Sequence, residues 1–338
     1  MNLYLESGYC DIKSIIELGL PFTFVIGGRG TGKTYGALKY AIETKTRILL
    51  MRRTQTQTDL INNPDFSPFK SIEHDMDITV TIQAATKYSR KIILDSDDEE
   101  FLLGYTCALS TISNLRGFDA SDVKLLIYDE FIPERHERLM KEEGDAFKHA
   151  YETINRNREL KGDKPLQVLA LANPLDIANP IFRKLELIDI CDKMKIRNKN
   201  VYISNARGLA IIMLDDSPIS QMKKTTALYK LTENSSFNDM ALSNDFAYNS
   251  NENISSRKLI EYRLIVGIGD IYIYKHKSKK EYYVSIHKQG DAPYYSDDEI
   301  NLDRFITKYG KKFYMYYMAN RFIFESQLAK TTFEWYIT

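Results

Sequence analysis

A glycine-rich stretch near the start of the chain carries the strongest chemical signal. Gly27 is followed, after four residues, by Gly32, Lys33 and Thr34, which is the phosphate-binding pattern G-x4-G-K-[ST]. Glycines let backbone N–H groups approach phosphate oxygens, the lysine reaches the β- and γ-phosphates, and the threonine hydroxyl ligates Mg²⁺. The pattern predicts a site for ATP and Mg²⁺ formed by Gly27, Gly28, Arg29, Gly30, Thr31, Gly32, Lys33, Thr34 and Tyr35.

The elements on either side of this stretch are those that a phosphate loop needs. Residues 22–26 form a short apolar, β-prone run, and a helical pattern with Ala37, Leu38 and Ala41 on one face follows the loop. The N-terminus of that helix points free N–H groups and partial positive charge at the same anion. The alternative interpretation is a glycine-rich turn without catalytic meaning, and the order of strand, loop and helix favours the nucleotide site.

A pair of acids supplies the second half of the predicted site. Asp129 and Glu130 follow directly after the apolar, β-rich run 123–128. Hydrolysis of ATP needs a metal anchor and a group that orients or deprotonates water. We expect Asp129 to hold Mg²⁺, directly or through water, and Glu130 to be the base. The alternative is a surface acidic pair after a strand.

Asn173 ends the next apolar run, residues 166–172. In a parallel sheet, ligands gather at the carboxyl ends of the strands. We therefore expect Asn173 beside Glu130, where it would contact water or the γ-phosphate. An Asn-Pro turn is the alternative use of this residue, and both uses are compatible.

Several arginines are candidates for contacts between subunits. Arg156 and Arg158 fall toward the end of a long charged stretch, residues 134–160, that is predicted to be helical. An arginine from a neighbour can stabilise charge on a transferring phosphoryl group, and residues two apart on a helix do not share a face, so one of the two is expected to point at a partner's nucleotide. A solvated helix end is the alternative. Arg29, inside the loop, could touch the same nucleotide or an adjacent one, and Arg116 is a further candidate for contact between subunits.

Composition bounds the class of protein. The 338 residues suggest two domains, and 46 basic residues balance 46 acidic ones, so no global positive field indicates nucleic acid.

A local basic patch is formed by Lys87, Arg90 and Lys91, between two predicted strands at 77–82 and 91–94. We predict an exposed hairpin tip that contacts the DNA backbone; a solvated tip without a partner is the alternative.

The order of elements predicts an α/β P-loop NTPase with a smaller second domain. Strands alternate with helices over residues 1–194, which indicates a parallel sheet flanked by helices. Residues 195–225 are net basic and are interpreted as a linker. Residues 226–338 contain a β-hairpin signal at 270–274 and 281–286 and an aromatic, helical stretch at 302–324, which predict a small α+β domain.

Targeting and cysteine signals are absent from the sequence. Cys10, Cys107 and Cys191 are scattered and outside any C-x-x-C spacing, which favours a reducing compartment without disulfides or structural zinc. No apolar run approaches the roughly 18 residues of a membrane span, and the first residues do not have a signal-peptide pattern. We therefore expect a cytoplasmic protein that does not bind membranes.

Four segments together resemble a known family. FVIGGRGTGKT, LLIYDEFIPE, INRNRE and LALANP occur in the order and with the spacing of the DNA-packaging ATPases of phi29-like tailed bacteriophages. The resemblance covers most of residues 20–185. It implies an additional-strand, catalytic-glutamate ATPase domain followed by a small domain similar to a degenerate RNase H-like nuclease.

The resemblance also implies a function and its partners. Members of this family form a homo-oligomeric ring, a pentamer by resemblance, that docks on the phage portal (connector) in the host cytoplasm and pumps double-stranded DNA into a prohead, with ATP hydrolysed at subunit interfaces. Whether a packaging RNA takes part stays open. By position, Lys33 and Thr34 would be the phosphate-loop pair, Asp129 the metal-side acid, Glu130 the catalytic glutamate and Arg156 the arginine finger.

One departure and two alternatives accompany this resemblance. Where a family member carries a lysine thought to act between subunits, this chain has Thr54 and Gln55. An active packaging nuclease would need carboxylates that converge on two metal ions, and the available acids form no convincing set; a generic P-loop NTPase unrelated to DNA is the other alternative. The acids considered for a nuclease are Asp215, Asp270, Asp291 and Glu299.

Overall fold

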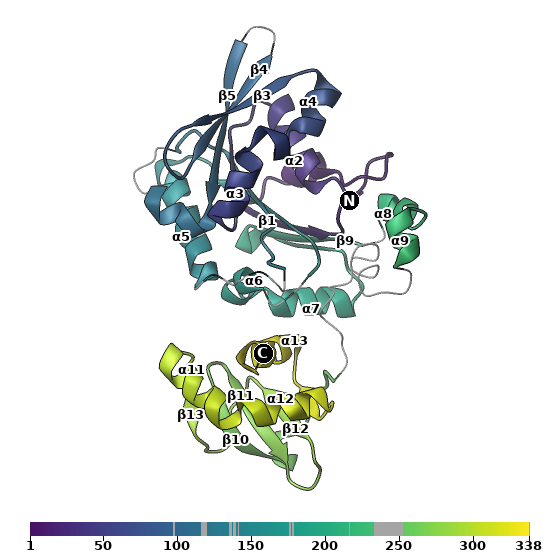
Figure 1. Cartoon of the computed structure of the whole chain (residues 1–338), viewed down its shortest axis with the longest axis vertical. Helices are drawn as coiled ribbons and strands as arrows, with labels where there is room; N and C mark the ends of the chain where they lie inside the picture. Colours follow the sequence, from purple (N-terminus) through teal and green to yellow (C-terminus); the bar gives the residue numbers. More distant parts are fainter. Residues whose placement is uncertain are drawn as a thin grey trace. The chain divides into compact units, whose positions relative to one another are not determined.

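The chain forms two compact units (Figure 1). The structure is a computed structural model that describes residues 1–96, 99–115, 120–134, 137, 140, 142–175, 177, 179–215, 217–232 and 253–337. The first unit comprises Met1–Leu185 with Lys193–Tyr248, and the second comprises Glu186–Asp192 with Asn249–Thr338.

The first unit is built on a nine-stranded sheet with the order β3-β4-β5-β2-β6-β7-β1-β9-β8. Its six central strands, from β5 to β9 in this order, run parallel to one another, and β7 lies between β1 and β6. The strands are β1 (Phe22–Gly27), β2 (Ile48–Arg52), β3 (Thr79–Ala84), β4 (Arg90–Ser96), β5 (Glu99–Ala108), β6 (Leu125–Asp129), β7 (Gln167–Ala172), β8 (Val201–Ser204) and β9 (Leu209–Leu214).

The sheet is mixed, which corrects the expectation of a purely parallel sheet. Strands β3, β4 and β5 pair antiparallel in sequence order at one edge, and β8 pairs antiparallel with β9 at the other. Short connections join these strands, and a short connection can only join antiparallel neighbours because a parallel pair needs a crossover of a dozen or more residues. The α/β fold itself is confirmed.

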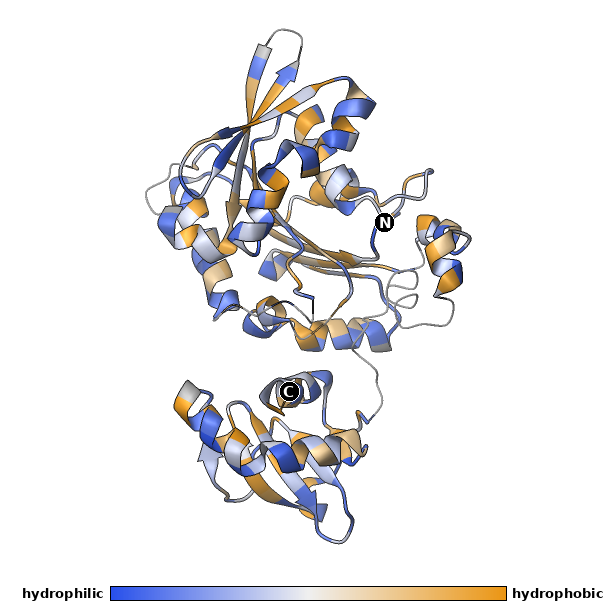
Figure 2. Ribbon diagram, viewed as in Figure 1, coloured by the Kyte–Doolittle hydropathy of each residue, from blue (hydrophilic) through white to orange (hydrophobic). Residues whose placement is uncertain are grey.

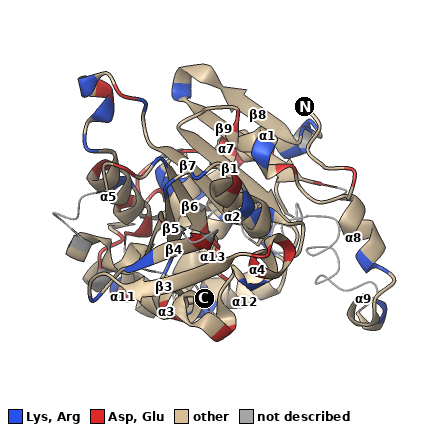
Figure 3. Ribbon diagram, turned by 90° about the horizontal axis from the view of Figure 1, so that it is seen from above, with Lys and Arg blue, Asp and Glu red and all other residues tan. Residues whose placement is uncertain are grey.

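The central strands are buried and apolar, whereas the helices around them are amphipathic (Figure 2). The burial of Val25, Leu50, Ile127 and Leu169 places the core on neighbouring strands of the sheet. The helices of this unit are α1 (Ile12–Ile16), α2 (Lys33–Glu43), α3 (Gln55–Asn62), α4 (Lys70–Met76), α5 (Glu143–Asn155), α6 (Pro180–Lys184), α7 (Ile188–Ile196, whose first residues belong to the second unit), α8 (Pro218–Lys223) and α9 (Ala227–Leu231). Acidic and basic residues are interspersed along the chain, in keeping with its zero net charge (Figure 3).

The helix expected over residues 134–160 is shorter than predicted. Helix α5 spans Glu143–Asn155, with Glu142 before it and Arg156 after it in the left-handed region at φ 52° and 47°. A left-handed residue interrupts the right-handed hydrogen-bond pattern, so both ends of the helix are fixed by backbone conformation. A separate 3₁₀ turn, Arg158–Lys161, follows.

The interpretation of residues 195–225 as a linker is wrong. β8 and β9 lie within this segment, and β9 pairs along its length with β1, the strand that leads into the phosphate loop. The run Leu209–Leu214 is entirely buried, so its apolar character, rather than the basic residues around it, decides its place. The first unit therefore continues past residue 194 and includes α8 and α9.

The second unit is α+β, with a five-stranded sheet of order β13-β10-β11-β12-β14. The predicted hairpin is confirmed as the antiparallel pair β11 and β12. The predicted helical stretch 302–324 is instead interrupted by a π-helical turn, Ile306–Gly310, and ends in a strand. The elements are β10 (Tyr262–Ile268), β11 (Ile271–His276), β12 (Tyr282–Ser285), β13 (Tyr294–Tyr295), β14 (Phe322–Phe324), α11 (Glu299–Phe305), α12 (Lys311–Met318) and α13 (Gln327–Ile337).

Aromatic side chains fill the core of the second unit. Phe313 packs against Phe305, Phe322 and Phe333 with ring centroids 5.7 to 6.2 Å apart. Within the described ranges, no helix of either unit has the length and apolar character that crossing a bilayer requires.

Candidate ATP-binding site

The phosphate loop lies between the end of β1 and the start of α2. Gly32 caps α2 in the left-handed region at φ 85°, which a residue with a Cβ adopts only with strain. The Nζ of Lys33 donates hydrogen bonds to the carbonyl oxygens of Gly27, at 2.6 Å, and Gly28, at 2.9 Å. Burial lowers the pKa of Lys33 to about 8. The loop thus folds around its own lysine, which is only 8% exposed.

Thr34 and Asp129 meet at the carboxyl edge of the sheet. The Thr34 hydroxyl donates to the Asp129 carboxylate, with distances of 3.1 and 3.0 Å to its two oxygens. Asp129 is the last residue of β6 and is 3% exposed. A hydroxyl and a carboxylate this close supply the hard oxygen ligands that Mg²⁺ prefers, while leaving room for phosphate and water ligands. The residues present therefore fit a magnesium ion bound with ATP.

Glu130 turns away from the strand immediately after Asp129. Its backbone is left-handed, at φ 56°, a conformation that a glutamate rarely adopts and that is often found at functional positions. Although 53% of the side chain is exposed, partial burial raises the pKa of the Glu130 carboxyl, and the nearby charge of Arg52 opposes the shift. This carboxylate faces the phosphate loop across a cavity.

That cavity gathers the predicted nucleotide residues. It has a volume of about 290 Å³, and Asn173, one residue beyond β7, lines it together with Glu130, as predicted. Tyr35 lines it as well, and its hydroxyl donates to Asp75 at 2.7 Å. The lining residues are Arg29, Gly30, Gly32, Lys33, Thr34, Tyr35, Asp129, Glu130, Ala172 and Asn173.

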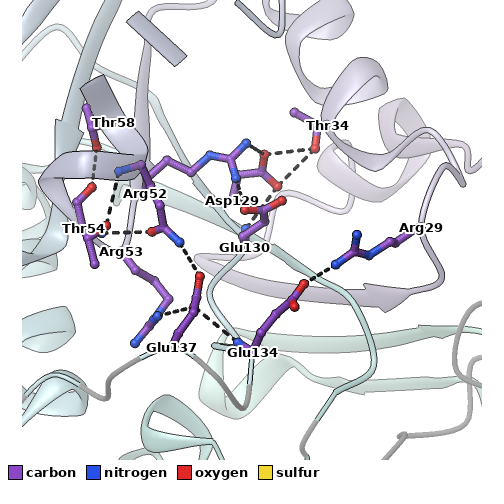
Figure 4. A network of polar contacts seen from close by, with 11 residues as sticks. Arg29, Thr34, Arg52, Arg53, Thr54, Thr58, Asp129, Glu130, Glu134 and Glu137 are labelled. Atoms are coloured by element: carbon purple, nitrogen blue, oxygen red, sulfur yellow. Dashed lines mark hydrogen bonds and ion pairs between the residues drawn. The ribbon is translucent and has the colours of Figure 1, made fainter. Parts of the chain in front are cut away.

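Arg52 is a member of the site that the sequence analysis did not assign to it. It ends β2, the neighbour of β6 in the sheet, and its Nη2 lies 2.8 Å from Asp129 Oδ2 while it also ion-pairs with Glu130 (Figure 4). Arg52 lies at the carboxyl end of a parallel strand, as Asn173 does, and this place could have indicated Arg52 from the sequence as well. Arg52 thus binds both carboxylates at the edge of the sheet where catalysis is expected.

Arg29 also has a partner that the sequence did not indicate. It lines the cavity and forms an ion pair with Glu134, in the segment after β6 (Figure 4). Half of the Arg29 side chain is exposed, so the pair contributes little to stability. It does connect the phosphate loop with the segment that follows Glu130.

Arg53 lies behind the site in a buried ion pair. Its guanidinium donates to both carboxylate oxygens of Glu143, at 2.7 and 2.9 Å, and to Glu137 at 2.7 Å. The side chains of Arg53 and Glu143 are both 0% exposed. Burial alone would lower the pKa of Arg53, but the hydrogen bonds and charge of Glu143 raise it. This bidentate pair fixes the end of β2 to the start of α5.

Removing one partner of this pair should destabilise the first unit. Arg53→Met is expected to lower the free energy of unfolding by about 3–5 kcal/mol, because it leaves the Glu143 carboxylate buried without its partner. Guanidinium denaturation followed by circular dichroism measures the change. The double variant Arg53→Met with Glu143→Leu should recover much of the loss; an Arg53→Met protein as stable as the wild type would contradict the account.

The two candidate finger arginines do not line the cavity of their own chain. Arg156 caps the C-terminus of α5 in the left-handed region. Arg158 donates to the carbonyl oxygen of Ala120 at 2.9 Å, and burial lowers its pKa. Helix α5 ends at Asn155, before either residue, so the two arginines do not lie on faces of one helix as expected. Arg116 lies outside the described residues.

The predicted basic hairpin is confirmed as a hairpin. β3 and β4 pair antiparallel, with Lys87 exposed in the turn and Lys91 exposed on β4. Arg90 differs, because its Nη1 donates to the carbonyl oxygens of Thr86 and Ser89 at 2.9 and 3.0 Å. Two of the three cations are therefore presented to solvent, and the third is tied to the turn.

Thr54 and Gln55 have a local structural use. Thr54 caps α3, with its hydroxyl accepting from Gln57 N and its own N–H donating to the Gln57 side chain. Gln55 donates to Asp59 one turn later in α3, at 2.8 Å. These residues thus stabilise the helix that follows β2.

The acids considered for a nuclease form no metal cluster where the structure describes them. Over those parts of the chain, no group of three or more His, Cys, Asp or Glu side chains is placed to hold a metal ion. Asp291 is fully exposed.

Comparison with known proteins places the chain in a family. The family described as "Podovirus DNA encapsidation protein (Gp16)" matches residues 7–269. The chain belongs to this family. The resemblance to phage DNA-packaging proteins that the sequence predicted is thereby confirmed.

Individual members show the same likeness. The DNA packaging proteins of Bacillus phages PZA and phi29 are each 25% identical over 258 residues, covering 75% of this chain and 70% of theirs. Among solved structures, the match to the Phi-28 gp11 DNA packaging motor covers 97% of this chain and 96% of the motor chain, with 18% identity and a TM-score of 0.61. The bacteriophage Phi-29 viral genome packaging motor assembly covers 99% of both chains, with 16% identity and a TM-score of 0.65. At these identities the structural likeness concerns the fold.

Proposed function

We propose that this chain is the ATPase subunit of a phage DNA-packaging motor, which hydrolyses ATP to move double-stranded DNA into a prohead. The observation that carries the proposal is the meeting of Thr34, Asp129 and Glu130 beside a phosphate loop, in a member of a DNA encapsidation family. Phosphoryl transfer needs this combination of a phosphate cradle, a metal anchor and a water-orienting group.

The residues of the cavity divide the work of hydrolysis. Lys33 exchanges the carbonyl oxygens of Gly27 and Gly28 for phosphate oxygens, which are stronger partners for an ammonium. Thr34 and Asp129 hold Mg²⁺, which neutralises charge on the phosphates when it is bound.

Other residues that line the cavity orient and deprotonate the attacking water. Glu130 takes its proton, and Asn173 orients the water or contacts the γ-phosphate from the end of β7. Arg52 pairs through its Nη1 with Oε2 of Glu130, and the other carboxylate oxygen, Oε1, accepts the proton of the water.

The remaining parts of the proposal concern assembly. Arg156 is proposed as the finger for a neighbour's nucleotide, a role supported by its absence from the cavity of its own chain. The place of β7 between β1 and β6 supports the additional-strand, catalytic-glutamate class. The ring of five, the portal and the degenerate nuclease-like second unit rest on the family resemblance.

DNA-dependent hydrolysis tests this function. Double-stranded DNA added to the assembled motor should raise its rate of ATP hydrolysis, independently of DNA sequence, because a motor that follows any genome contacts the backbone. A generic nucleotide hydrolase would show no response to DNA, and that result would contradict the proposal.

The hairpin cations are proposed to contact the DNA backbone. Lys87→Ala and Lys91→Ala are each expected to reduce the slope of log affinity against log salt by about 0.9, because each removes one charge that neutralises a phosphate of duplex DNA. Arg90→Ala should have a smaller direct effect, since Arg90 bonds its own turn. Fluorescence anisotropy with labelled duplex measures the slope, and Lys164→Ala, in an exposed loop, is the control. Unchanged slopes would rule out the hairpin as the tracking element.

A further inference from the structure

Lys223 reaches the phosphate loop from an element outside the predicted site. It is the last residue of α8, and its Nζ donates a hydrogen bond to the carbonyl oxygen of Arg29. Among the described residues, no carboxylate forms an ion pair with this ammonium. The loop that folds around Lys33 is therefore contacted by a second lysine, from α8, whose ammonium donates to the main chain of the loop.

Gly30 makes room for this lysine. A Cβ built on Gly30 would lie 2.2 Å from the Nζ and 3.2 Å from the Cε of Lys223. Gly30 also lines the nucleotide cavity, and its φ of 70° is left-handed. The ammonium thus lies against a residue of the cavity wall, and a Cβ at position 30 would displace the end of the lysine side chain.

The start of α8 is fastened to the N-terminal segment. The Tyr4 hydroxyl donates to the carbonyl oxygen of Asp215 at 2.7 Å, and the Ser217 hydroxyl donates to the carbonyl oxygen of Gly8 at 3.4 Å. Ser217 is fully buried. Lys223 is therefore supplied by a helix held beside the loop, and basic residues on α8 and α9 are visible in Figure 3.

Two ammonium groups on one loop repel each other. The Nζ of Lys33 bonds the carbonyl oxygens of Gly27 and Gly28, and the Nζ of Lys223 bonds that of Arg29, so both charges lie on neighbouring residues of the loop. A polyphosphate relieves this repulsion because it offers several negative oxygens to both lysines. The arrangement favours an anion with more charge than one lysine can match.

We propose that Lys223 is a second phosphate-binding lysine of this site, delivered by α8 of the same chain and acting together with Lys33 on the polyphosphate of ATP. The inference rests on the proposed ATP site. When ATP binds, Lys223 exchanges the Arg29 carbonyl oxygen for a phosphate oxygen.

Nucleotide titrations test this inference. The dissociation constants of a fluorescent ATP analogue and of its ADP counterpart are measured with Mg²⁺ for the full chain. Lys223→Ala and Lys223→Gln should each raise the constant for ATP about tenfold and that for ADP less, because a charge-assisted bond to phosphate is removed.

Matched variants distinguish the effect of the Lys223 charge on ATP binding from a change in the structure of the loop. Lys223→Gln keeps a donor for the Arg29 carbonyl oxygen, whereas Lys223→Arg keeps the charge and should bind ATP nearly as wild type does. Lys224→Ala, at the exposed neighbouring position, should bind normally. Wild-type ATP affinity in Lys223→Gln would overturn the inference.

Lys33→Ala, measured in parallel, tells this failure from a failure of the proposed function. If Lys33→Ala binds ATP more weakly than wild type while the Lys223 variants bind it with wild-type affinity, only the proposed role of Lys223 is wrong. If Lys33→Ala binds ATP as tightly as wild type, the phosphate-loop site itself is wrong.

Discussion

Glu130→Gln is expected to reduce ATP hydrolysis about 10²–10⁴-fold while leaving ATP binding intact, because a general base contributes roughly that factor. Glutamine has the same shape and can still bond Arg52, but it cannot accept a proton from water. The phosphate loop and the Thr34–Asp129 pair are unchanged in this variant, so the nucleotide and its magnesium retain their ligands. Steady-state phosphate release and titration with a fluorescent ATP analogue measure the two properties separately.

Glu152→Gln is the matched control for this variant. Glu152 is exposed on α5, and the same change of charge there should leave both hydrolysis and binding at wild-type values. Hydrolysis by Glu130→Gln at the wild-type rate would show that another group activates the water.

Arg156→Ala is expected to have an equally large effect, a loss of about 10³–10⁵-fold in hydrolysis, which is the usual contribution of an arginine finger. The variant should bind ATP normally because Arg156 does not line the cavity of its own chain. Sharing of the site between subunits can then be tested by mixing Arg156→Ala with Glu130→Gln, each of which is inactive alone.

In the mixed ring, some interfaces regain a complete site. An Arg156→Ala subunit supplies the loop and Glu130, and an adjacent Glu130→Gln subunit supplies the arginine. With random equal mixing, about a quarter of interfaces should hydrolyse ATP. Single-turnover conditions are needed, so that a ring that stops after one hydrolysis still counts. A mixture that assembles and stays inactive would contradict a shared site.

The meeting of the candidate nucleotide residues at one cavity could be predicted from sequence, because these residues lie within one loop or at the end of a buried strand. Lys33 and Thr34 lie within one loop, and Asp129 and Asn173 each follow an apolar run whose carboxyl end must reach the same edge of a parallel sheet. DNA as the substrate was inferred from the family resemblance, because the neutral composition does not indicate a nucleic-acid partner.

The features that were missed in the sequence depend on contacts between residues far apart in the chain. Arg52 and Arg53 are adjacent, yet one points into the site and the other into a buried pair with Glu143, 90 residues away along the chain. No local sequence pattern predicts which acidic residue an arginine will pair with. The buried strand β9 was missed because the basic residues around it suggested a linker. Lys223 depends on that same strand, because β9 leads into α8 beside the loop.

The central claim is that ATP hydrolysis at this cavity moves DNA, and a packaging assay tests it most directly. Proheads of the phage that encodes this chain are mixed with its DNA, ATP and either wild-type protein or Glu130→Gln, and the DNA protected from nuclease is measured. The account predicts protected, full-length DNA with the wild type and none with Glu130→Gln, although that variant binds ATP and attaches to the prohead. Packaging of DNA by Glu130→Gln at the wild-type level would contradict it.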